Sequence, residues 1–471
     1  MKKQVFNPYL PSWEYIPDGE PRVFDGRVYV FGSHDRFNGY AFCLNDYVCW
    51  SAPEDDLKQW RYEGVIYRRN QDPKNPEGKY IFQAPDVVKG PDGRYYLYYV
   101  MGGFSVVSVA VCDTPAGEYE FYGYVHYADG TLLGEKEGDQ PQFDPGVLEE
   151  NGKVYLYTGF CTVIDDKVKG ATVTVLKEDM LTVSEDPVVV APGKMTSAGT
   201  SFEGHEFFEA ASIRKVEDKY FFIYSSVVYH ELCYAVSDSP TGGFVYKGVL
   251  VSNNDSHIST YKPAEKPMFY GGNNHGSIAK INGEWYIFYH RQTNGTSFSR
   301  QGCAEKLKMN SEGGFEQAEM TSCGLNGGPL EGKGMYPAYI ACNLFCPTEE
   351  PYSAAPGEWM DARFPKITQD GKDGDEEAGY IANMKTGATA GFKYFDCKGI
   401  HRITIRTRGF ATGKYYVKTA WDGERLGSID IDISDEWKAW SADISIPDGV
   451  HALYFEYEGM GNPSLASFEL E

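Results

Sequence analysis

The chain has 471 residues, of which 42% are hydrophobic and 24% are charged, so its composition is that of a globular protein and not of a disordered one. Its net charge of −23 repels phosphate groups and anionic lipids, which argues against nucleic-acid and membrane-surface functions. Aromatic residues make up 15% of the chain, and 52 Gly and 25 Pro punctuate it, a combination typical of many short strands separated by turns. We therefore expect an all-β fold.

The N-terminus has no apolar stretch of signal-peptide length after its two lysines, and no run of about 18 apolar residues occurs in the chain. None of the ten cysteines form a CxxC pair, and we expect them to be buried thiols. Cys342 and Cys346 are spaced as a metal-binding pair would be, but no matching His or Cys pair lies near them. A cytoplasmic location fits these features best, and an exported protein whose leader has been removed is the alternative.

One pattern repeats five times over the first 340 residues: a polar residue, a short apolar strand, a turn containing Gly or Asp, and an aromatic-rich strand. The five units begin at Asp18, Asp86, Asp144, Glu209 and His275. Asp-Gly and Asn-Gly turns supply the positive φ angles that a tight hairpin needs, and a second hairpin usually follows the first. Four strands per unit correspond to one propeller blade, so five units predict a five-bladed β-propeller.

The residue that opens each unit lies at the start of the innermost strand, and these strands line the central axis of a propeller. Asp often opens a turn merely because its side chain bonds nearby backbone N–H groups. Five equivalent positions that are all polar are better explained by one shared site, because converging buried charge is costly unless it serves chemistry.

Carboxyl groups that face each other across a pocket can hydrolyse a glycosidic bond. One of them must be protonated to donate to the leaving oxygen, and the other must be ionised to activate water or to attack the anomeric carbon. A third carboxylate beside the acid raises the pKa of the acid by like-charge repulsion. The repeat offers such a third group.

These spaced motifs resemble glycoside hydrolase family 43, a family of five-bladed propellers that hydrolyse with inversion. NPYLPSWEYIPDGEPRVFDGRVYVFGSHD resembles the blade of the general base, which implies Asp18. FDPGVLEENGKVYLYTGF resembles the blade whose Asp modulates the pKa of the acid, which implies Asp144. HEFFEAASIRKVEDKYFFIYSS resembles the blade of the general acid, which implies Glu209.

The resemblance extends over roughly residues 5 to 344 and implies substrate-binding roles for Asp86, His275 and Arg300. It also implies that His275 lies near a structural Ca²⁺ ion on the propeller axis, with no organic cofactor. Glu20 remains a rival for the general base, because it stands before Pro21 as the base of the family stands before a proline. Asp18 is preferred because it keeps the family's interval of eleven residues to Tyr29.

Several aromatic residues near these motifs are candidates for a platform under a sugar ring, with the hydrophobic core as the alternative for each. They are Trp13, Phe82, Phe104 and Phe160. Asn294-Gly295-Thr296 matches a glycosylation sequon, but we expect it to be an ordinary loop.

The pattern changes after residue 344. We expect a linker over residues 345–358 and a β-sandwich over residues 359–471, because about seven short strands follow at close spacing. This segment resembles carbohydrate-binding module family 6, although the Asp-Trp pair near the end of that family is missing here. Tyr380, Trp437 or Trp440 would stack on sugar or belong to the core, and we expect the acidic stretch Asp370–Glu377 to be a solvated loop in preference to a calcium site.

The sequence thus predicts an inverting, exo-acting α-L-arabinofuranosidase for arabinoxylan-derived oligosaccharides. The alternative is a β-D-xylosidase or a dual enzyme, because the two sugars place their hydroxyl groups similarly. A sugar-binding propeller without catalysis is a third possibility, which three intact carboxyl groups argue against. Partners are expected to be arabinose- or xylose-containing oligosaccharides, with no nucleic acid and no membrane.

Overall fold

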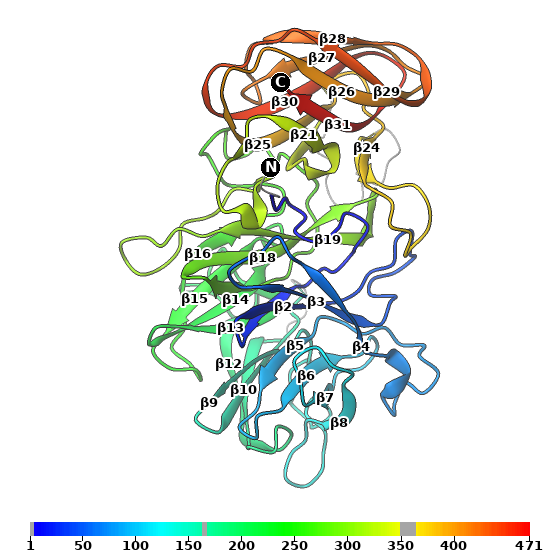
Figure 1. Ribbon diagram of the computed structural model, residues 1–471. Coiled ribbons are helices and arrows are strands. Elements are labelled where there is room, and N and C mark those ends of the chain that lie inside the picture. Colours follow the sequence, from blue (N-terminus) through cyan, green and yellow to red (C-terminus); the bar gives the residue numbers. More distant parts are fainter. Residues whose placement is uncertain (1–3, 163–166, 349–363) are drawn as a thin grey trace.

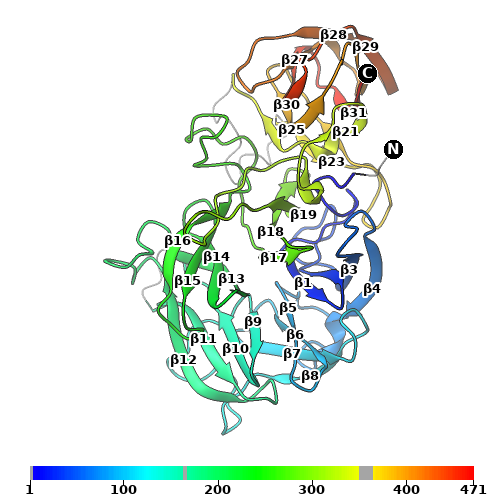
Figure 2. The same cartoon turned by 60° about the vertical axis from the view of Figure 1, so that its left-hand side comes forward.

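The computed structural model describes residues 4–162, 167–348 and 364–471, and nearly all of its regular structure is β-strand (Figure 1). Five sheets surround a central axis, and a second all-β unit lies at one end of this ring (Figure 2). The expected propeller and sandwich are both confirmed. No helix in the described ranges is long and apolar enough to cross a membrane.

Four blades are four-stranded antiparallel sheets whose strands pair in chain order, and the fifth has three strands. Blade one comprises β1 (Glu20–Phe24), β2 (Arg27–Phe31), β3 (Tyr47–Pro53) and β4 (Arg61–Tyr67). Blade two comprises β5 (Asp86–Lys89), β6 (Tyr95–Val100), β7 (Val107–Cys112) and β8 (Glu120–Tyr124). Blade three comprises β9 (Gly146–Glu150), β10 (Lys153–Thr158), β11 (Gly170–Leu176) and β12 (Val183–Pro192). Blade four comprises β13 (Phe207–Val216), β14 (Lys219–Ser226), β15 (Leu232–Ser237) and β16 (Val245–Val251). Blade five comprises β17 (Ile278–Ile281), β18 (Glu284–Thr293) and β19 (Thr296–Lys306).

The first hairpin of each blade forms where the sequence places its turn. Asn151 and Gly152 join β9 to β10 with φ angles of 55° and 77°, and Asn282 and Gly283 join β17 to β18 with 48° and 85°. Asn and Gly tolerate these left-handed conformations, which match the twist of the two strands. Asn294 is likewise a turn residue, between β18 and β19, and its side chain is buried.

Blade five differs from the expected four strands because the chain leaves the ring after β19. The N-terminal segment covers the strand edge that remains. The Tyr9 N–H donates to the Gly302 carbonyl at 3.4 Å, and Asn7 Nδ2 donates to the Ala304 carbonyl at 2.9 Å. A covered edge cannot pair with another chain, so this segment closes the blade.

The second unit is a sandwich of two six-stranded sheets. One sheet holds β20 (Leu330–Glu331), β22 (Asn343–Phe345), β25 (Thr389–Cys397), β27 (Thr412–Lys418), β28 (Gly427–Ile431) and β30 (Gly449–Met460). The other holds β21 (Gly334–Pro337), β23 (Lys366–Thr368), β24 (Tyr380–Ala382), β26 (Ile403–Gly409), β29 (Ser434–Ala442) and β31 (Ser464–Leu470). Three short 3-10 helices complete the described structure: η1 (Arg69–Gln71), η2 (Gly324–Asn326) and η3 (Ala338–Ile340).

The sandwich begins earlier in the chain than the expected boundary at residue 344. β20 pairs with β25 and β21 pairs with β31, so Leu330–Glu331 and Gly334–Pro337 already belong to the sandwich sheets. These short strands lack the alternating pattern of a repeat, which is why they were not visible in the sequence. Most of the expected linker, residues 349–358, lies outside the described residues.

The two units share one hydrophobic core. Buried side chains of blades four and five, such as Phe221 and Tyr289, belong to the same cluster as Phe392 and Phe468 of the sandwich. The sandwich is therefore packed directly against the propeller.

Candidate active site

A cavity of about 310 Å³ opens at the centre of the ring, which is the lower end of the size range of small-molecule sites. Segments of all five blades line it: Asp18, Phe42, Cys43, Gln83, Ala84, Phe143, Asp144, Phe160, Phe208, Glu209, Asn273, His275 and Arg300. Five of the six site residues that the sequence predicts, all except Asp86, therefore meet in one cavity.

Asp18 precedes β1, and its backbone has the left-handed φ angle of 57°. A left-handed aspartate costs conformational energy, and such strain concentrates at functional sites. Arg300 Nη1 donates to Asp18 Oδ1 at 2.9 Å. Burial alone would raise the pKa of Asp18, but the positive charges of Arg300 and His275 outweigh it and hold this pKa below its ordinary value. Asp18 is thus ionised at neutral pH, as a general base must be.

Two further groups fix Arg300 and Asp18 in place. The Arg300 guanidinium also donates to both carboxylate oxygens of buried Asp35, at 2.8 and 2.9 Å. Burial lowers the pKa of His290 to about 3, so its imidazole is neutral. The Asp18 N–H donates to His290 Nδ1 at 3.2 Å, while His290 Nε2 donates to the Asn273 carbonyl at 2.7 Å.

Glu209 lies in β13 at a break in its pairing with β14. Register shifts flank Glu209 on both sides, so the strand bulges at this residue. Bulges of this kind re-aim a side chain next to an active site. Burial, Asp144 and Asp18 raise the pKa of Glu209 to about 8. Glu209 is therefore protonated at neutral pH and can act as a general acid.

Asp144 is the third carboxyl residue of the cavity, and it contacts the residue that follows Glu209. It has a left-handed φ angle of 46°, and its Oδ2 accepts a hydrogen bond of 3.0 Å from the N–H of Ala210, the residue after Glu209. Burial and the Asp18 charge raise the pKa of Asp144. Two buried carboxyl groups in one cavity resist joint ionisation, so the charge of Asp144 helps to keep a proton on Glu209.

His275 lies between two carboxyl groups, those of Asp144 and Glu20. Its Nδ1 lies 3.7 Å from Asp144 Oδ2, and its Nε2 lies 3.4 Å from Glu20 Oε1. Burial would lower the pKa of His275, but Glu20, Asp144 and Asp18 raise it to about 9. His275 is thus itself a buried cation at neutral pH.

Asp86 does not reach the cavity, contrary to the expectation that it binds substrate. Its buried carboxylate accepts from Arg22 Nε at 3.0 Å and from the Val147 N–H at 2.9 Å, and it lies 3.9 Å from Arg214. The equivalent position in blade two thus joins neighbouring blades through an ion-pair network.

Glu20, the rival for the base, also lies in this network and does not line the cavity. Arg214 Nη2 donates to Glu20 Oε2, and Arg214 and His275 lower the pKa of Glu20 to about 2 against the effect of burial. The structure therefore favours Asp18 over Glu20 as the general base.

The expected calcium site does not fit the residues around His275. Ca²⁺ requires six to eight oxygen ligands. Glu20 Oε1 has no hydrogen-bond partner, but the other oxygens of Glu20 and Asp86 already accept from Arg22, Arg214 and backbone or hydroxyl groups. Two guanidinium groups and the His275 imidazolium already balance the two carboxylates, so a divalent cation would meet no excess negative charge.

The other wall of the cavity is aromatic. Phe143 and Phe160 lie 5.1 Å apart, and Phe160 meets Phe208 edge-on at 5.4 Å between ring centroids. Phe42 lies under the Arg300 guanidinium at 4.8 Å. An aromatic wall facing polar groups suits a sugar, which has an apolar ring face and polar hydroxyl edges.

Of the proposed platform residues, only Phe160 lines the cavity. Phe82 is fully buried in blade packing, Trp13 packs against Trp50, and Phe104 packs against Tyr80. Phe143 and Phe208 were missed, although each directly precedes a blade-opening carboxyl residue. This repeated Phe-acid pair is the signal that would have identified them.

In the sandwich, the aromatic residues proposed to stack on sugar have protein partners. The Arg408 guanidinium lies over Tyr380 at 4.9 Å and over Trp437 at 4.3 Å. Trp440 Nε1 donates to Thr407 Oγ1 at 2.9 Å. The resemblance to carbohydrate-binding module family 6 stays a prediction.

Comparison with known proteins identifies the family. Residues 20–315 match the model described as Glycosyl hydrolases family 43. A protein of Thermoclostridium stercorarium named xylosidase/arabinosidase is 68% identical, and the match spans 100% of this chain and 99% of that protein.

Solved structures show that the fold is shared. A family 43 arabinoxylan arabinofuranohydrolase from Bacillus subtilis, in complex with cellotetraose, has a TM-score of 0.52 at 19% identity over 100% of this chain and 98% of that one. A β-xylosidase/α-arabinofuranosidase from a compost metagenome, with xylotriose and in a calcium-free form, has a TM-score of 0.51 at 24% identity over 66% of this chain and 96% of that one. Because the family model covers more than half of the chain and the 68% identical relative spans all of it, this protein belongs to glycosyl hydrolase family 43.

Proposed function

We propose that this glycoside hydrolase releases α-L-arabinofuranose from the ends of arabinoxylan-derived oligosaccharides, with inversion at the anomeric carbon. The observation that carries the proposal is the meeting of Glu209 and Asp18 in one cavity, whose surroundings raise the pKa of Glu209 and lower the pKa of Asp18. The name of the 68% identical relative, xylosidase/arabinosidase, supports the substrate class.

The reaction is a single displacement. Asp18 accepts a proton from a water molecule, which attacks the anomeric carbon, while Glu209 donates its proton to the departing glycosidic oxygen. Asp144 keeps Glu209 protonated until the bond breaks, and Arg300 keeps Asp18 ionised.

Exo action is supported by the small volume of the cavity. Lining residues from all five blades surround it, and its volume of about 310 Å³ suits a terminal sugar better than the middle of a polymer chain. The alternative activity, β-D-xylosidase, uses the same groups, and the relative's name covers both sugars.

Glu209→Gln and Asp18→Asn distinguish the two roles when each is assayed on a natural oligosaccharide and on an aryl glycoside with a highly acidic leaving group. We expect Glu209→Gln to lose about 10²–10⁴-fold on the oligosaccharide but much less on the activated glycoside, which needs no proton. Asp18→Asn should lose activity on both.

Wild-type rates on aryl α-L-arabinofuranoside and aryl β-D-xyloside, measured side by side, decide between the two activities. A higher kcat/KM on the xyloside would replace the main proposal by the alternative. Turnover of neither would indicate a sugar-binding propeller without catalysis.

We also propose that catalysis needs no calcium on the axis, since Arg22, Arg214 and His275 already supply positive charge there. Adding Ca²⁺ to chelator-treated protein should leave kcat/KM unchanged. A several-fold increase of kcat/KM on adding Ca²⁺ would contradict the proposal that catalysis needs no calcium.

A further inference from the structure

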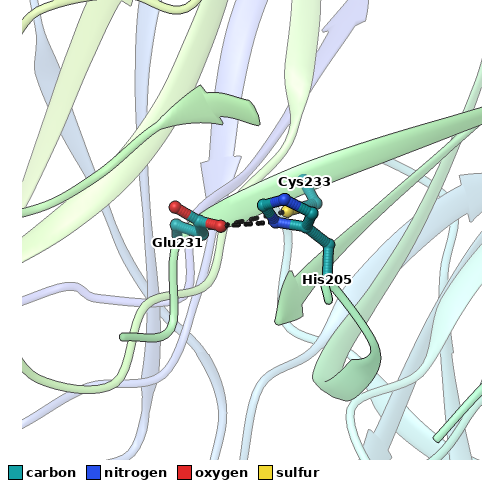
Figure 3. A group of neighbouring side chains, drawn as sticks. All are labelled: His205, Glu231 and Cys233. Atoms are coloured by element: carbon teal, nitrogen blue, oxygen red, sulfur yellow. Dashed lines mark hydrogen bonds and ion pairs between the residues drawn. The ribbon is translucent and has the colours of Figure 1, made fainter. Parts of the chain in front are cut away.

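A second group of chemically reactive side chains lies in blade four, outside the cavity. Figure 3 shows His205, which precedes β13, directed toward Glu231 and Cys233 at the start of β15. His205 Nδ1 lies 2.8 Å from Glu231 Oε1, and Cys233 Sγ lies 3.9 Å from the same oxygen. The three potential ligand atoms all lie within 4.8 Å of one another.

The charge on Glu231 has an unusual set of partners. Its carboxylate is fully buried, and within the described parts of the chain its ion-pair partners are two imidazoles, those of His205 and His257. Glu206, the buried residue that follows His205, is instead paired with the ammonium group of Lys194 at 2.9 Å. A buried carboxylate needs a compensating positive charge, and around Glu231 the candidates are also metal ligands.

The geometry points to a site for a divalent transition-metal ion of the zinc class, held by His205, Glu231 and Cys233. Zinc–ligand distances are about 2.0–2.2 Å for nitrogen and oxygen and about 2.3 Å for sulfur, so small side-chain movements would place the three atoms around one ion. Nitrogen, oxygen and sulfur together select such a metal over calcium or magnesium. On binding, the S–H bond of Cys233 is replaced by a metal–sulfur bond and its proton passes to solvent.

Access and support for the ion are both present. The His205 side chain is 34% exposed, while Glu231 and Cys233 are fully buried, so an ion would enter past the imidazole. Tyr246 stacks on His205 at 4.6 Å, and His257 Nδ1 lies 3.3 Å from the second oxygen of Glu231. Outer partners of this kind orient metal ligands.

The ion would be structural and would stiffen the wall that holds the general acid. His230, next to Glu231, has its Nδ1 3.7 Å from Glu209 Oε1 and meets Phe208 of the cavity edge-on at 4.8 Å. His205 lies four residues before Glu209. One ion would therefore join the two segments that carry Glu209 and His230.

Cobalt titration of the chelator-treated full-length protein tests the site without using hydrolysis. We expect one equivalent of Co²⁺ to bind and to give a thiolate-to-cobalt charge-transfer band, which Zn²⁺ then removes by displacement. His205→Gln, which changes a partly exposed residue, should weaken Co²⁺ binding at least tenfold.

Cys233→Ser should abolish the band, while the matched control Cys112→Ser, in blade two, should retain it. If Cys233→Ser misfolds by circular dichroism, the His205→Gln titration decides alone. Absence of stoichiometric binding to the wild type, or a band that survives in both blade-four variants, would overturn the proposal.

Discussion

The three carboxyl groups of the cavity differ because their charged neighbours differ. Asp18 contacts the Arg300 guanidinium, which favours its ionised form, whereas Glu209 faces two carboxyl groups in a buried setting, which favours its protonated form. The difference supports the proposed roles of Asp18 as base and Glu209 as acid, although both are buried.

The pH dependence of kcat/KM follows from this assignment. The acid must be protonated, so activity should fall as the pH rises through the Glu209 pKa of about 8, and it should persist on the acidic side to below the ordinary pKa of an aspartate. Asp144→Asn removes a neighbouring negative charge and should lower the Glu209 pKa, which moves the alkaline limb to lower pH. The Asn side chain can still accept from the Ala210 N–H, so local geometry is retained.

Complete pH–rate profiles of the wild type and of Asp144→Asn provide the measurement. Asp92→Asn, a charge change in an exposed turn of blade two, is the control and should leave the limb in place. If the alkaline limb of Asp144→Asn lies at the same pH as in the wild type, or at a higher pH, Asp144 does not act on the acid through its charge.

At the scale of elements, catalysis depends on how closely neighbouring blades approach. Gly146, two residues after Asp144, lies at the start of β9 against β13, the strand of Glu209. A Cβ atom at Gly146 would lie 2.5 Å from the Ala211 carbonyl oxygen and 2.8 Å from Ser212 Cα, and these backbone atoms cannot move independently of the strand. The glycine therefore sets the distance between the two acidic residues.

Gly146→Ala should push β9 away from β13 and reduce kcat by about 10²-fold, the effect of a displacement of about 1 Å at a reacting group. Gly242→Ala is the matched control, because a Cβ there meets nothing within 4 Å. Steady-state kinetics of the two folded variants would test this, and an unchanged kcat in Gly146→Ala would contradict the role of the close contact.

The blades, and the meeting of Asp18, Asp144 and Glu209 in one cavity, could be predicted from the sequence because each repeat marks its own hairpin turn and opening residue. The position of Asp86 outside the cavity could not be predicted, since Asp86 opens a blade as Asp144 does and only the neighbouring Arg22 and Arg214 make it an ion-pair partner. The positive charge that Arg22 and Arg214 bring to the carboxylates beside His275, where the calcium ion was expected, could not be predicted either, because these contacts join blades far apart in sequence. Strands β20 to β22 escaped prediction because they are two to four residues long and owe their structure to partners in the sandwich.

At the scale of the whole molecule, the C-terminal part of the chain contacts a loop that lines the cavity. Asp373, in the acidic loop, accepts from the Phe37 N–H at 2.7 Å and from Asn45 Nδ2 at 3.0 Å. These residues belong to the loop between β2 and β3, which supplies Phe42 and Cys43 to the cavity. The acidic stretch Asp370–Glu377 is exposed, as expected, but its Asp373 also holds the β2–β3 loop in place.

Asp373→Ala should loosen this loop and raise KM by up to about tenfold, the equivalent of one charge-assisted hydrogen bond of about 1.5 kcal/mol, with little change in kcat. Glu376→Ala removes the same charge at an exposed position of the same loop and serves as the control. Equal KM values for both variants would show that the sandwich does not influence the site.

The stereochemistry of the first product tests the paired roles of Asp18 and Glu209 most directly. Proton NMR of the early reaction with aryl α-L-arabinofuranoside should show β-L-arabinofuranose appearing first, followed by mutarotation, because one water molecule displaces the leaving group from the opposite face. Initial release of the α-anomer would require a double displacement through a covalent intermediate and would contradict the account.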